Sequence, residues 1–341
     1  MSLATLVIVV VVMALLFDFV NGWNDSANAI ATVVGTRVLA PFSAVMLAAT
    51  LNLTGAMFGT EVANTMAKMI YPELLTSQET VMIVIVAGLL SAAIWAATMT
   101  VFGMPISGSH SLIGGIVGAA VAAGGVDILV AKNVGKTLMA MLFAPVMGFV
   151  VAYFFYVSLV WLVRRVRPSV INRTFGKLQI VSASLMAFTH GTNDAQKVMG
   201  IITLALLTGG FQDAPGRDGE FEVQLWVKIS CALVISLGTA VGGWKVIKTL
   251  GHHLTKLGPA EGFAAETSAS LVLTIAAWLG IPTSTTHTIT GAILGLGATR
   301  GVSSVRWGLG EKIVLAWVFT LPITAALGGA IFWAFAVLMG G

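Results

Sequence analysis

Apolar segments follow one another along almost the whole chain. Such runs occupy residues 3–17, 41–59, 80–102, 137–163 and 313–339, and several approach the roughly 20 residues that a helix needs to cross a bilayer. Only 9% of the 341 residues are charged, whereas a soluble domain carries about a quarter. Backbone groups in hydrocarbon must be bonded within the protein, and strand-like alternation is absent, so the spans are helices. The sequence therefore predicts an all-α polytopic membrane protein with about 10–12 transmembrane segments in a lipid bilayer.

The basic residues gather in the short connections between these segments. The net charge of +4 is therefore interpreted as a topology signal and not as a sign of a nucleic-acid partner. Cys231 is the single cysteine, which excludes an intramolecular disulfide.

A polar motif interrupts the first apolar region and recurs far downstream. Residues 21–28 read Asn-Gly-Trp-Asn-Asp-Ser-Ala-Asn, and residues 190–197 read His-Gly-Thr-Asn-Asp-Ala-Gln-Lys. The shared core is Gly-x-Asn-Asp. The surrounding regions, 3–36 and 178–210, are too long for one simple span and awkward for two, so each is predicted to be a broken span with an unwound middle. Polar groups in hydrocarbon are costly, which makes both motifs candidate functional sites.

A second motif is also duplicated. Residues 105–111 read Pro-Ile-Ser-Gly-Ser-His-Ser, and residues 282–288 read Pro-Thr-Ser-Thr-Thr-His-Thr. Both follow an apolar segment and are predicted to be Pro-led hairpins. Two motifs that recur in the same order indicate an internal repeat, although chance similarity between apolar stretches is the alternative. The predicted organisation is a first membrane repeat at 1–163, a basic cytoplasmic linker at 164–177 and a second membrane repeat at 178–341.

The loop charges predict the orientation of the repeats. Lys and Arg dominate the connections at 164–177, 245–256 and 300–312, whereas 61–79 and 211–222 are acidic. Placing the basic connections in the cytoplasm gives each repeat an odd number of crossings, so the second repeat is inverted and both termini lie outside. Lys132 and Lys136 then fall on the outer side, which is the one conflict. Inverted repeats with broken helices are typical of secondary transporters, whose sites lie between the repeats.

The hydroxyl-rich starts of the two hairpin helices are candidates for binding an oxyanion. A proline disfavours helix before it, hydroxyl residues cap a new helix, and a helix N-terminus attracts anions. Two such ends could converge on one tetrahedral anion; alternatively, the hydroxyls only cap their own helices. The candidate phosphate ligands are Ser107, Ser109, Ser284, Thr285, Thr286, Asn28, Lys197 and Gln196.

The Asn-Asp motifs suit a small hard cation, because carboxylate and amide oxygens are its preferred ligands. Asp25 and Asp194 would repel an anion unless a cation lay between them, which points to cation-coupled anion transport. Lys197 could pair with Asp194 or contact the anion. The alternative is that the amides only tie broken helices together. The candidate sodium ligands are Asn24, Asp25, Asn193, Asp194, Asn21 and Thr283.

The remaining polar residues of the spans are less specific. His110 and His287 occupy matching positions and are interpreted as hydrogen-bonded structural groups. No His, Cys or carboxylate spacing indicates a transition-metal site. Glu266 enters an apolar stretch and is either a loop-edge charge or a coupling residue. The Gly114/Gly118 and Gly291/Gly295 pairs have the spacing of close helix packing.

These motifs resemble the signature of the PiT inorganic phosphate transporters. The resemblance rests on the doubled Gly-x-Asn-Asp and on the Pro-x-Ser-Thr-Thr-His at 282–287, and it covers nearly the whole chain. It implies inverted repeats, phosphate uptake coupled to sodium or protons, and essential carboxylates in the Asn-Asp motifs. Some relatives carry a glutamate where this chain has Asn52, whereas Glu266 keeps the matching role in the second repeat; both are candidate coupling residues. The short chain resembles prokaryotic members.

The resulting prediction is a sodium-coupled inorganic phosphate symporter of the plasma membrane, not an enzyme, with sodium as coupling ion and no cofactor. The alternatives are a proton-coupled phosphate or metal–phosphate transporter and a sulfate permease. A passive anion channel and an intramembrane hydrolase using Ser109 or Ser284 with His110 or His287 are further alternatives. A second copy of the chain is a candidate partner in a homodimer.

Overall fold

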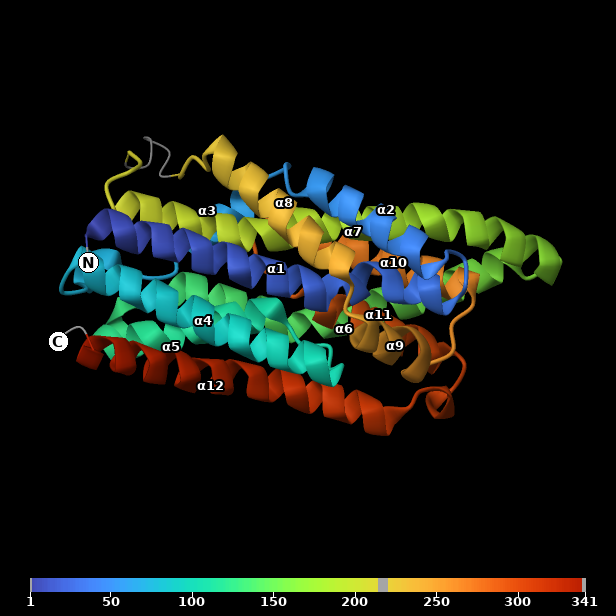
Figure 1. Cartoon of the computed structure of the whole chain (residues 1–341). Helices are drawn as coiled ribbons and strands as arrows, with labels where there is room; N and C mark the ends of the chain where they lie inside the picture. Colours follow the sequence, from blue (N-terminus) through green and yellow to red (C-terminus); the bar gives the residue numbers. More distant parts are fainter. Residues whose placement is uncertain (1, 214–219, 339–341) are drawn as a thin grey trace.

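A computed structural model describes residues 2–213 and 220–338, and this part of the chain contains twelve α-helices and no strand (Figure 1). The first half contains α1 (Leu3–Gly35), α2 (Pro41–Gly55), α3 (Glu61–Ala67), η1 (Pro72–Leu74), α4 (Gln78–Phe102), α5 (Gly108–Gly124), η2 (Val126–Ile128) and α6 (Ala131–Val163). The second half contains α7 (Pro168–Thr208), α8 (Leu225–Val241), α9 (Trp244–Lys248), η3 (Thr249–His253), α10 (Pro259–Trp278), α11 (Thr285–Thr299), η4 (Val302–Ser304) and α12 (Trp307–Leu338). Arg217 and Asp218 of the predicted acidic connection lie outside the described residues.

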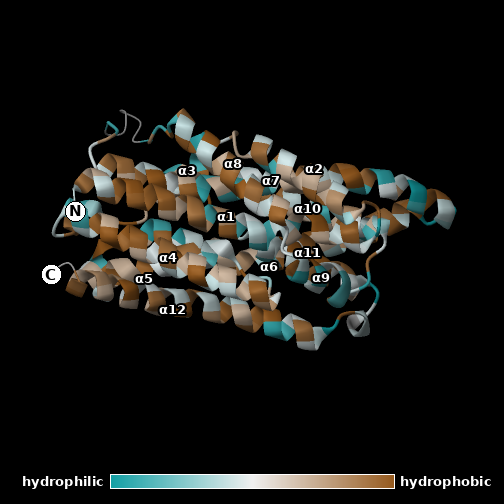
Figure 2. Cartoon of the chain, viewed as in Figure 1, coloured by the Kyte–Doolittle hydropathy of each residue, from teal (hydrophilic) through white to brown (hydrophobic). Residues whose placement is uncertain are grey.

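The helices have the apolar surface of a multi-pass membrane protein. In the described part of the chain, α1, α4, α6 and α12 are each long and apolar enough to cross a bilayer alone. Large apolar side chains such as Leu142 and Phe154 on α6 and Val318 on α12 are exposed. Figure 2 shows hydrophobic residues along most of the bundle and a hydrophilic projecting end at the start of α7. The helices α5 and α11, of 17 and 15 residues, measure about 25 and 22 Å at 1.5 Å per residue, so neither spans a core of about 30 Å alone.

The predicted unwound segments at the Asn-Asp motifs are wrong. Both α1 and α7 run without a break through residues 21–28 and 190–197. Several of the polar side chains bond to neighbouring helices, as Asn24 does to Thr100 and Asp25 to Thr286, and the backbone ladder stays intact. A break occurs instead between α8 and α9, where the chain bends by 63° and Gly242 has a φ of 73°.

The two Pro-led hairpins form as predicted. Helix α4 ends at Gly103, whose left-handed φ of 73° suits glycine, and Ser107 caps the start of α5. The second hairpin follows the same plan, with Gly280 at a φ of 59° after α10 and Ser284 as the cap of α11. Each proline lies in the short non-helical link between a long helix and a short one.

The short hairpin helices pack closely on helices of the other half. A Cβ at Gly118 on α5 would meet the carbonyl oxygen of Ala325 on α12, and a Cβ at Gly295 on α11 would meet that of Phe149 on α6. Small residues allow this approach of one backbone to another. The predicted packing role of the glycine pairs is confirmed, and each half contributes one hairpin helix to the other.

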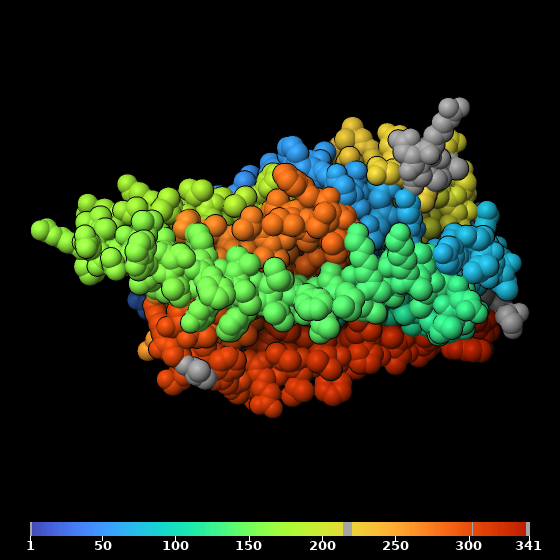
Figure 3. All heavy atoms as spheres, turned by 180° about the vertical axis from the view of Figure 1, so that it is seen from behind, coloured from blue at the N-terminus to red at the C-terminus, as the bar shows by residue number. Residues whose placement is uncertain are grey.

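The connections gather at the two ends of the bundle. At one end Asn64 accepts a hydrogen bond of 2.6 Å from the Phe221 N–H, and this end carries both termini (Figure 1). At the other end the loops around Thr255 and Val305 form a bridge. The predicted basic linker is largely helical, because α7 begins at Pro168, a residue favoured in a first turn. The end of α6 and the start of α7 project beyond the rest of the molecule (Figure 3).

Lys136 has a local role that accounts for its place at the end that carries the termini. Its ammonium donates to the carbonyl of Leu279, 3.1 Å away, just past the last residue of α10. The C-terminus of a helix favours a nearby cation. This basic residue on the predicted outer side thus interacts with a helix end.

Candidate functional site

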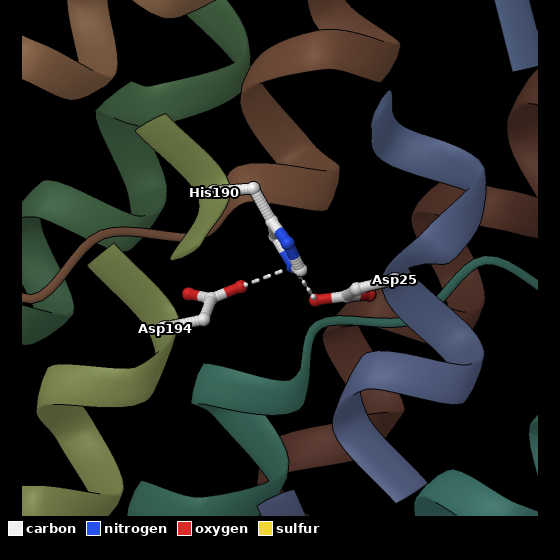
Figure 4. Close-up of side chains that lie close together, drawn as sticks. All are labelled: Asp25, His190 and Asp194. Carbon is white, nitrogen blue, oxygen red and sulfur yellow. Dashed lines mark ion pairs between the residues drawn. The ribbon is translucent and has the colours of Figure 1, made fainter. Parts of the chain in front are cut away.

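The two Asn-Asp motifs meet at the centre of the bundle. The carboxylates of Asp25 on α1 and Asp194 on α7 lie on either side of the His190 imidazole (Figure 4). His190 Nε2 is 3.0 Å from Asp194 Oδ2 and 3.8 Å from Asp25 Oδ2. One ligand atom from each residue lies within 4.8 Å of the other two. Residues far apart in the sequence therefore form one cluster that could hold a cation.

The start of α11 supplies hydroxyl donors to both carboxylates. Thr286 Oγ1 donates to Asp25 Oδ1 at 2.9 Å, and Thr285 Oγ1 donates to Asp194 Oδ2 at 2.9 Å. Thr285 Oγ1 also lies 3.4 Å from Asp25 Oδ2. Asn28 Nδ2 donates to the two threonine oxygens at 3.2 and 3.1 Å. Candidate anion ligands and candidate cation ligands are thus in direct contact.

Lys197 joins the second Asn-Asp motif to the first hairpin. Its ammonium forms an ion pair with Asp194 and donates to Ser109 Oγ at 2.5 Å and to the Thr283 carbonyl at 2.8 Å. The expectation that Lys197 pairs with Asp194 is met. Ser109 Oγ in turn donates to the Thr283 carbonyl at 3.1 Å, so the two hairpin links touch at this point.

The cluster is closed to solvent, and its net charge depends on the protonation of His190. Every side chain named so far in it is at most 5% exposed. The ammonium of Lys197 offsets one of the two carboxylates. His190, which lies within ion-pair distance of both, offsets the other only when it is protonated, so a neutral His190 leaves one carboxylate without a formal counter-charge. Burying an uncompensated charge is expensive. A monovalent cation in this cluster would balance the charge, and the hydroxyls and the ammonium are suitable donors to an oxyanion.

Ser107 and Ser284 act as helix caps. Ser107 Oγ accepts from the His110 N–H at 3.1 Å, and Ser284 Oγ accepts from the His287 N–H at 3.2 Å. Ser107 Oγ is also 2.8 Å from His110 Nδ1, and the imidazoles of His110 and His287 are tilted by 40° with centroids 4.4 Å apart. The geometry of these two serines agrees with the alternative that the hydroxyls cap their own helices. Ser109, Thr285 and Thr286, in contrast, face the central cluster.

Three of the predicted ligands also hold parts of the bundle together. Gln196 Oε1 accepts from the Val62 N–H at 2.9 Å, so it satisfies the start of α3 and does not join Lys197. Asn24 Nδ2 donates to Thr100 Oγ1 at 2.7 Å. Asn193 Nδ2 donates to the Thr189 carbonyl at 2.9 Å.

Some amide oxygens of the motifs have no protein donor in the described part of the chain. They belong to Asn21, Asn24, Asn28 and Asn193. Asn21 lies against Gly108 at the start of α5. Thr283 contributes its carbonyl to Lys197, while its hydroxyl donates to the Ile281 carbonyl at 3.1 Å. These buried oxygens remain suitable for a cation.

Glu266 is an intramembrane residue and not a loop-edge charge. It is fully buried on α10 and accepts hydrogen bonds from Thr32 and Ser182. Gln179 Nε2 donates to it at 3.3 Å. Asn52, the other candidate coupling residue, lies elsewhere: its Oδ1 is 3.0 Å from His190 Nδ1. The two are therefore parts of different networks.

His190 is the central residue that the sequence analysis did not assign as a ligand. It is the first residue of the second motif, and its spacing of four residues from Asp194 places both on one helix face. That spacing was the available signal. Its orientation toward Asp25 on α1 depends on tertiary structure, as does the bond that holds its other nitrogen to Asn52.

Comparison with known proteins agrees with the fold. The model of the "Phosphate transporter family" matches residues 21–328. The chain belongs to this family. It is 46% identical over 331 residues to a "Probable low-affinity inorganic phosphate transporter" of Rhizobium meliloti (strain 1021), which covers 96% of each protein. A Bacillus subtilis (strain 168) protein with the same name is 41% identical over 326 residues, again 96% of each.

A solved structure has the same fold. It is described as "The sodium-dependent phosphate transporter", and it superposes with a TM-score of 0.87 at 24% identity over 98% of this chain and 100% of that one. The family and the relatives are transporters and not enzymes, which excludes the hydrolase alternative. The resemblance drawn from the motifs is confirmed.

Proposed function

We propose that this phosphate transporter family member is a sodium-coupled symporter of inorganic phosphate in the plasma membrane. One observation carries the proposal: the hydroxyls of Thr285 and Thr286 bond directly to the carboxylates of Asp194 and Asp25. An anion site and a cation site that share their ligands cannot be occupied independently. The names of the relatives and of the solved structure support phosphate as the anion and sodium as the cation.

The shared ligands suggest the order of binding. Sodium at Asp25 and Asp194 would replace the hydroxyl donors at the carboxylate oxygens and cancel the negative charge that repels an anion. The two threonine hydroxyls would then be free to donate to phosphate, together with Lys197 and Ser109. Charge-assisted hydrogen bonds of this kind are the stronger ones. Phosphate would therefore bind after sodium.

We also propose that the halves are inverted repeats with the basic end of the bundle in the cytoplasm. The exchanged packing of α5 on α12 and α11 on α6 supports a pseudo-two-fold relation, and loop charge supports the orientation. Both termini would then lie outside. A cavity of about 400 Å³ lined by Glu61, Thr189 and Asn193 lies on the outer side of the cluster and is a candidate entry path for sodium. The homodimer remains a prediction.

Two specific observations favour alternatives. His190 bridges the carboxylates, so a proton could take the place of sodium. The Asp25–His190–Asp194 set also matches the ligands of divalent metals, which favours a metal–phosphate complex as substrate. Sulfate has the same shape as phosphate and is the third alternative.

Uptake by reconstituted proteoliposomes tests the proposal. Radiolabelled phosphate and sulfate are compared under an inward sodium gradient, under choline at the same pH, and with EDTA present. We expect uphill phosphate uptake that requires sodium and persists in EDTA. Equal uptake in choline would indicate proton coupling, loss in EDTA would indicate a metal complex, and failure to accumulate phosphate uphill would indicate a channel.

A further inference from the structure

A polar stripe extends along α1 beyond the central cluster. Asp18, Asn21, Asp25, Asn28 and Thr32 are spaced by three and four residues in turn, which places them on one helix face. All five are buried. Asp18 lies seven residues before Asp25, so the two carboxylates are about 10 Å apart along the helix axis. Asp18 therefore lies between the cluster and the end of the bundle that carries the termini.

Asp18 is a buried carboxylate without hydrogen-bond partners. It is 0% exposed, and within the described part of the chain neither of its oxygens accepts a hydrogen bond from protein. Asp25 and Asp194, by contrast, each accept bonds from the hydroxyls of α11. A carboxylate without partners is among the most expensive groups to bury in a membrane protein and by default has a function there.

No cationic side chain in the described part of the chain forms an ion pair with Asp18. The titratable groups that interact with it electrostatically are Asp194, His190 and Lys197 on α7 and Cys231 on α8. The ammonium of Lys197 is already paired with Asp194. One turn further along the stripe, Asn21 Oδ1 is also buried and without a donor. Asp18 and Asn21 thus place three buried oxygens without a donor on one helix face, and carboxylate and amide oxygens are suitable ligands for a cation.

Asp18 is not part of the duplicated framework. The position seven residues before Asp194 in the second motif is Ala187, so the second half has no equivalent carboxylate. A residue required for the symmetric packing of α1 and α7 would be expected in both. Its presence in one half only indicates a role along one path, from one side of the membrane.

We propose that Asp18, together with the amide oxygen of Asn21, binds a further coupling cation between the central cluster and the outer end of the bundle. The inference rests on the proposed symport and adds a second cation to it. The chemistry of the site, a carboxylate neutralised by a monovalent cation, suits sodium or a proton. The site receives the cation before it reaches Asp25 and Asp194.

The number of positive charges carried with each phosphate tests the inference. Proteoliposomes of the unaltered protein, Asp18→Asn and Asp127→Asn are held at set potentials, and the potential at which phosphate flux reverses gives the charge per phosphate. Asp127 is exposed in η2 and provides the control for loss of one carboxylate. We expect Asp18→Asn to carry one positive charge fewer, with a shallower dependence of uptake on sodium, and Asp127→Asn to match the unaltered protein.

Two further measurements separate the outcomes. A pH-sensitive dye inside the vesicles reports proton entry, and loss of proton entry in Asp18→Asn identifies the cation as a proton. Binding of ²²Na⁺ to detergent-purified protein needs no transport, so it applies even when the variant is inactive; one bound sodium fewer identifies sodium. An Asp18→Asn protein that keeps the charge per phosphate, or an inactive one that keeps both its bound sodium and its proton uptake, overturns the inference. Absence of phosphate uptake by the unaltered protein would instead refute the proposed function.

Discussion

Asp25→Asn changes the charge of the central cluster but not the size of the side chain. The substitution keeps the size of the side chain and an oxygen that can accept from Thr286, which now donates to Asp25 Oδ1 at 2.9 Å. It removes one of the two carboxylates that lie within 4.8 Å of each other around His190. Any cation held among these atoms loses one full charge from its nearest ligands.

The expected loss follows from the distances in the cluster. Two unit charges 4 Å apart attract each other by about 4 kcal/mol at an effective dielectric constant of 20. Because 1.4 kcal/mol corresponds to a factor of ten, sodium affinity should fall by about 1000-fold, or about 100-fold if the amide oxygen retains part of the contact. The fold should persist, since removing one of two neighbouring carboxylates also removes their mutual repulsion.

Sodium titration of phosphate uptake in proteoliposomes measures this effect, and thermal unfolding in detergent checks the fold. The half-saturating sodium concentration should rise beyond the accessible range in Asp25→Asn, with a melting temperature at least as high as that of the unaltered protein. Asp127→Asn, at an exposed site, should behave as the unaltered protein does. Normal sodium dependence in Asp25→Asn would refute the assignment of the cation to this cluster.

Substitutions at three other positions test phosphate affinity and the stability of the fold. Thr286→Val removes one hydroxyl donor and should weaken phosphate affinity by about 10-fold, as expected for a bond to a charged group, which the KM for phosphate measures; an unchanged KM would contradict a direct contact. Lys197→Met leaves Asp194 without its ammonium partner and should destabilise the fold by about 3–5 kcal/mol, seen as a lower midpoint in denaturant, whereas Lys197→Arg should retain most of the stability. Gly291→Val places side-chain atoms against the Pro145 carbonyl on α6 and should reduce the yield of folded protein on size exclusion, while Gly135→Val, at a site with open space, should not.

The local sequence patterns predicted several elements correctly. The Pro-led hairpins form where Pro105 and Pro282 indicated them, because proline and the hydroxyl caps act on their own neighbours in the chain. The glycine pairs pack as expected, because only glycine allows the backbones of α5 and α12 to approach so closely. Lys197 pairs with Asp194, which was one of the two roles predicted for it.

Local sequence patterns could not show that the two long helices, α1 and α7, run without a break through the Asn-Asp motifs. The polar residues at 21–28 suggested that α1 unwinds, since side chains of this kind are costly in hydrocarbon. Their cost is met across the bundle, for example by Thr100 for Asn24 and Thr286 for Asp25. These partners lie on α4 and α11, so no property of α1 alone could have shown that its backbone stays helical.

The sequence by itself determined the membrane class, the hairpins, the duplicated motifs and the types of atom available for a cation and an anion. Tertiary structure alone decided which of those atoms meet. It placed His190 between two carboxylates, directed Gln196 to α3, and left Asp18 without a hydrogen-bond partner among the described residues. The physical reason is that composition and spacing act along one helix, whereas the compensation of a buried charge depends on which helices lie beside it.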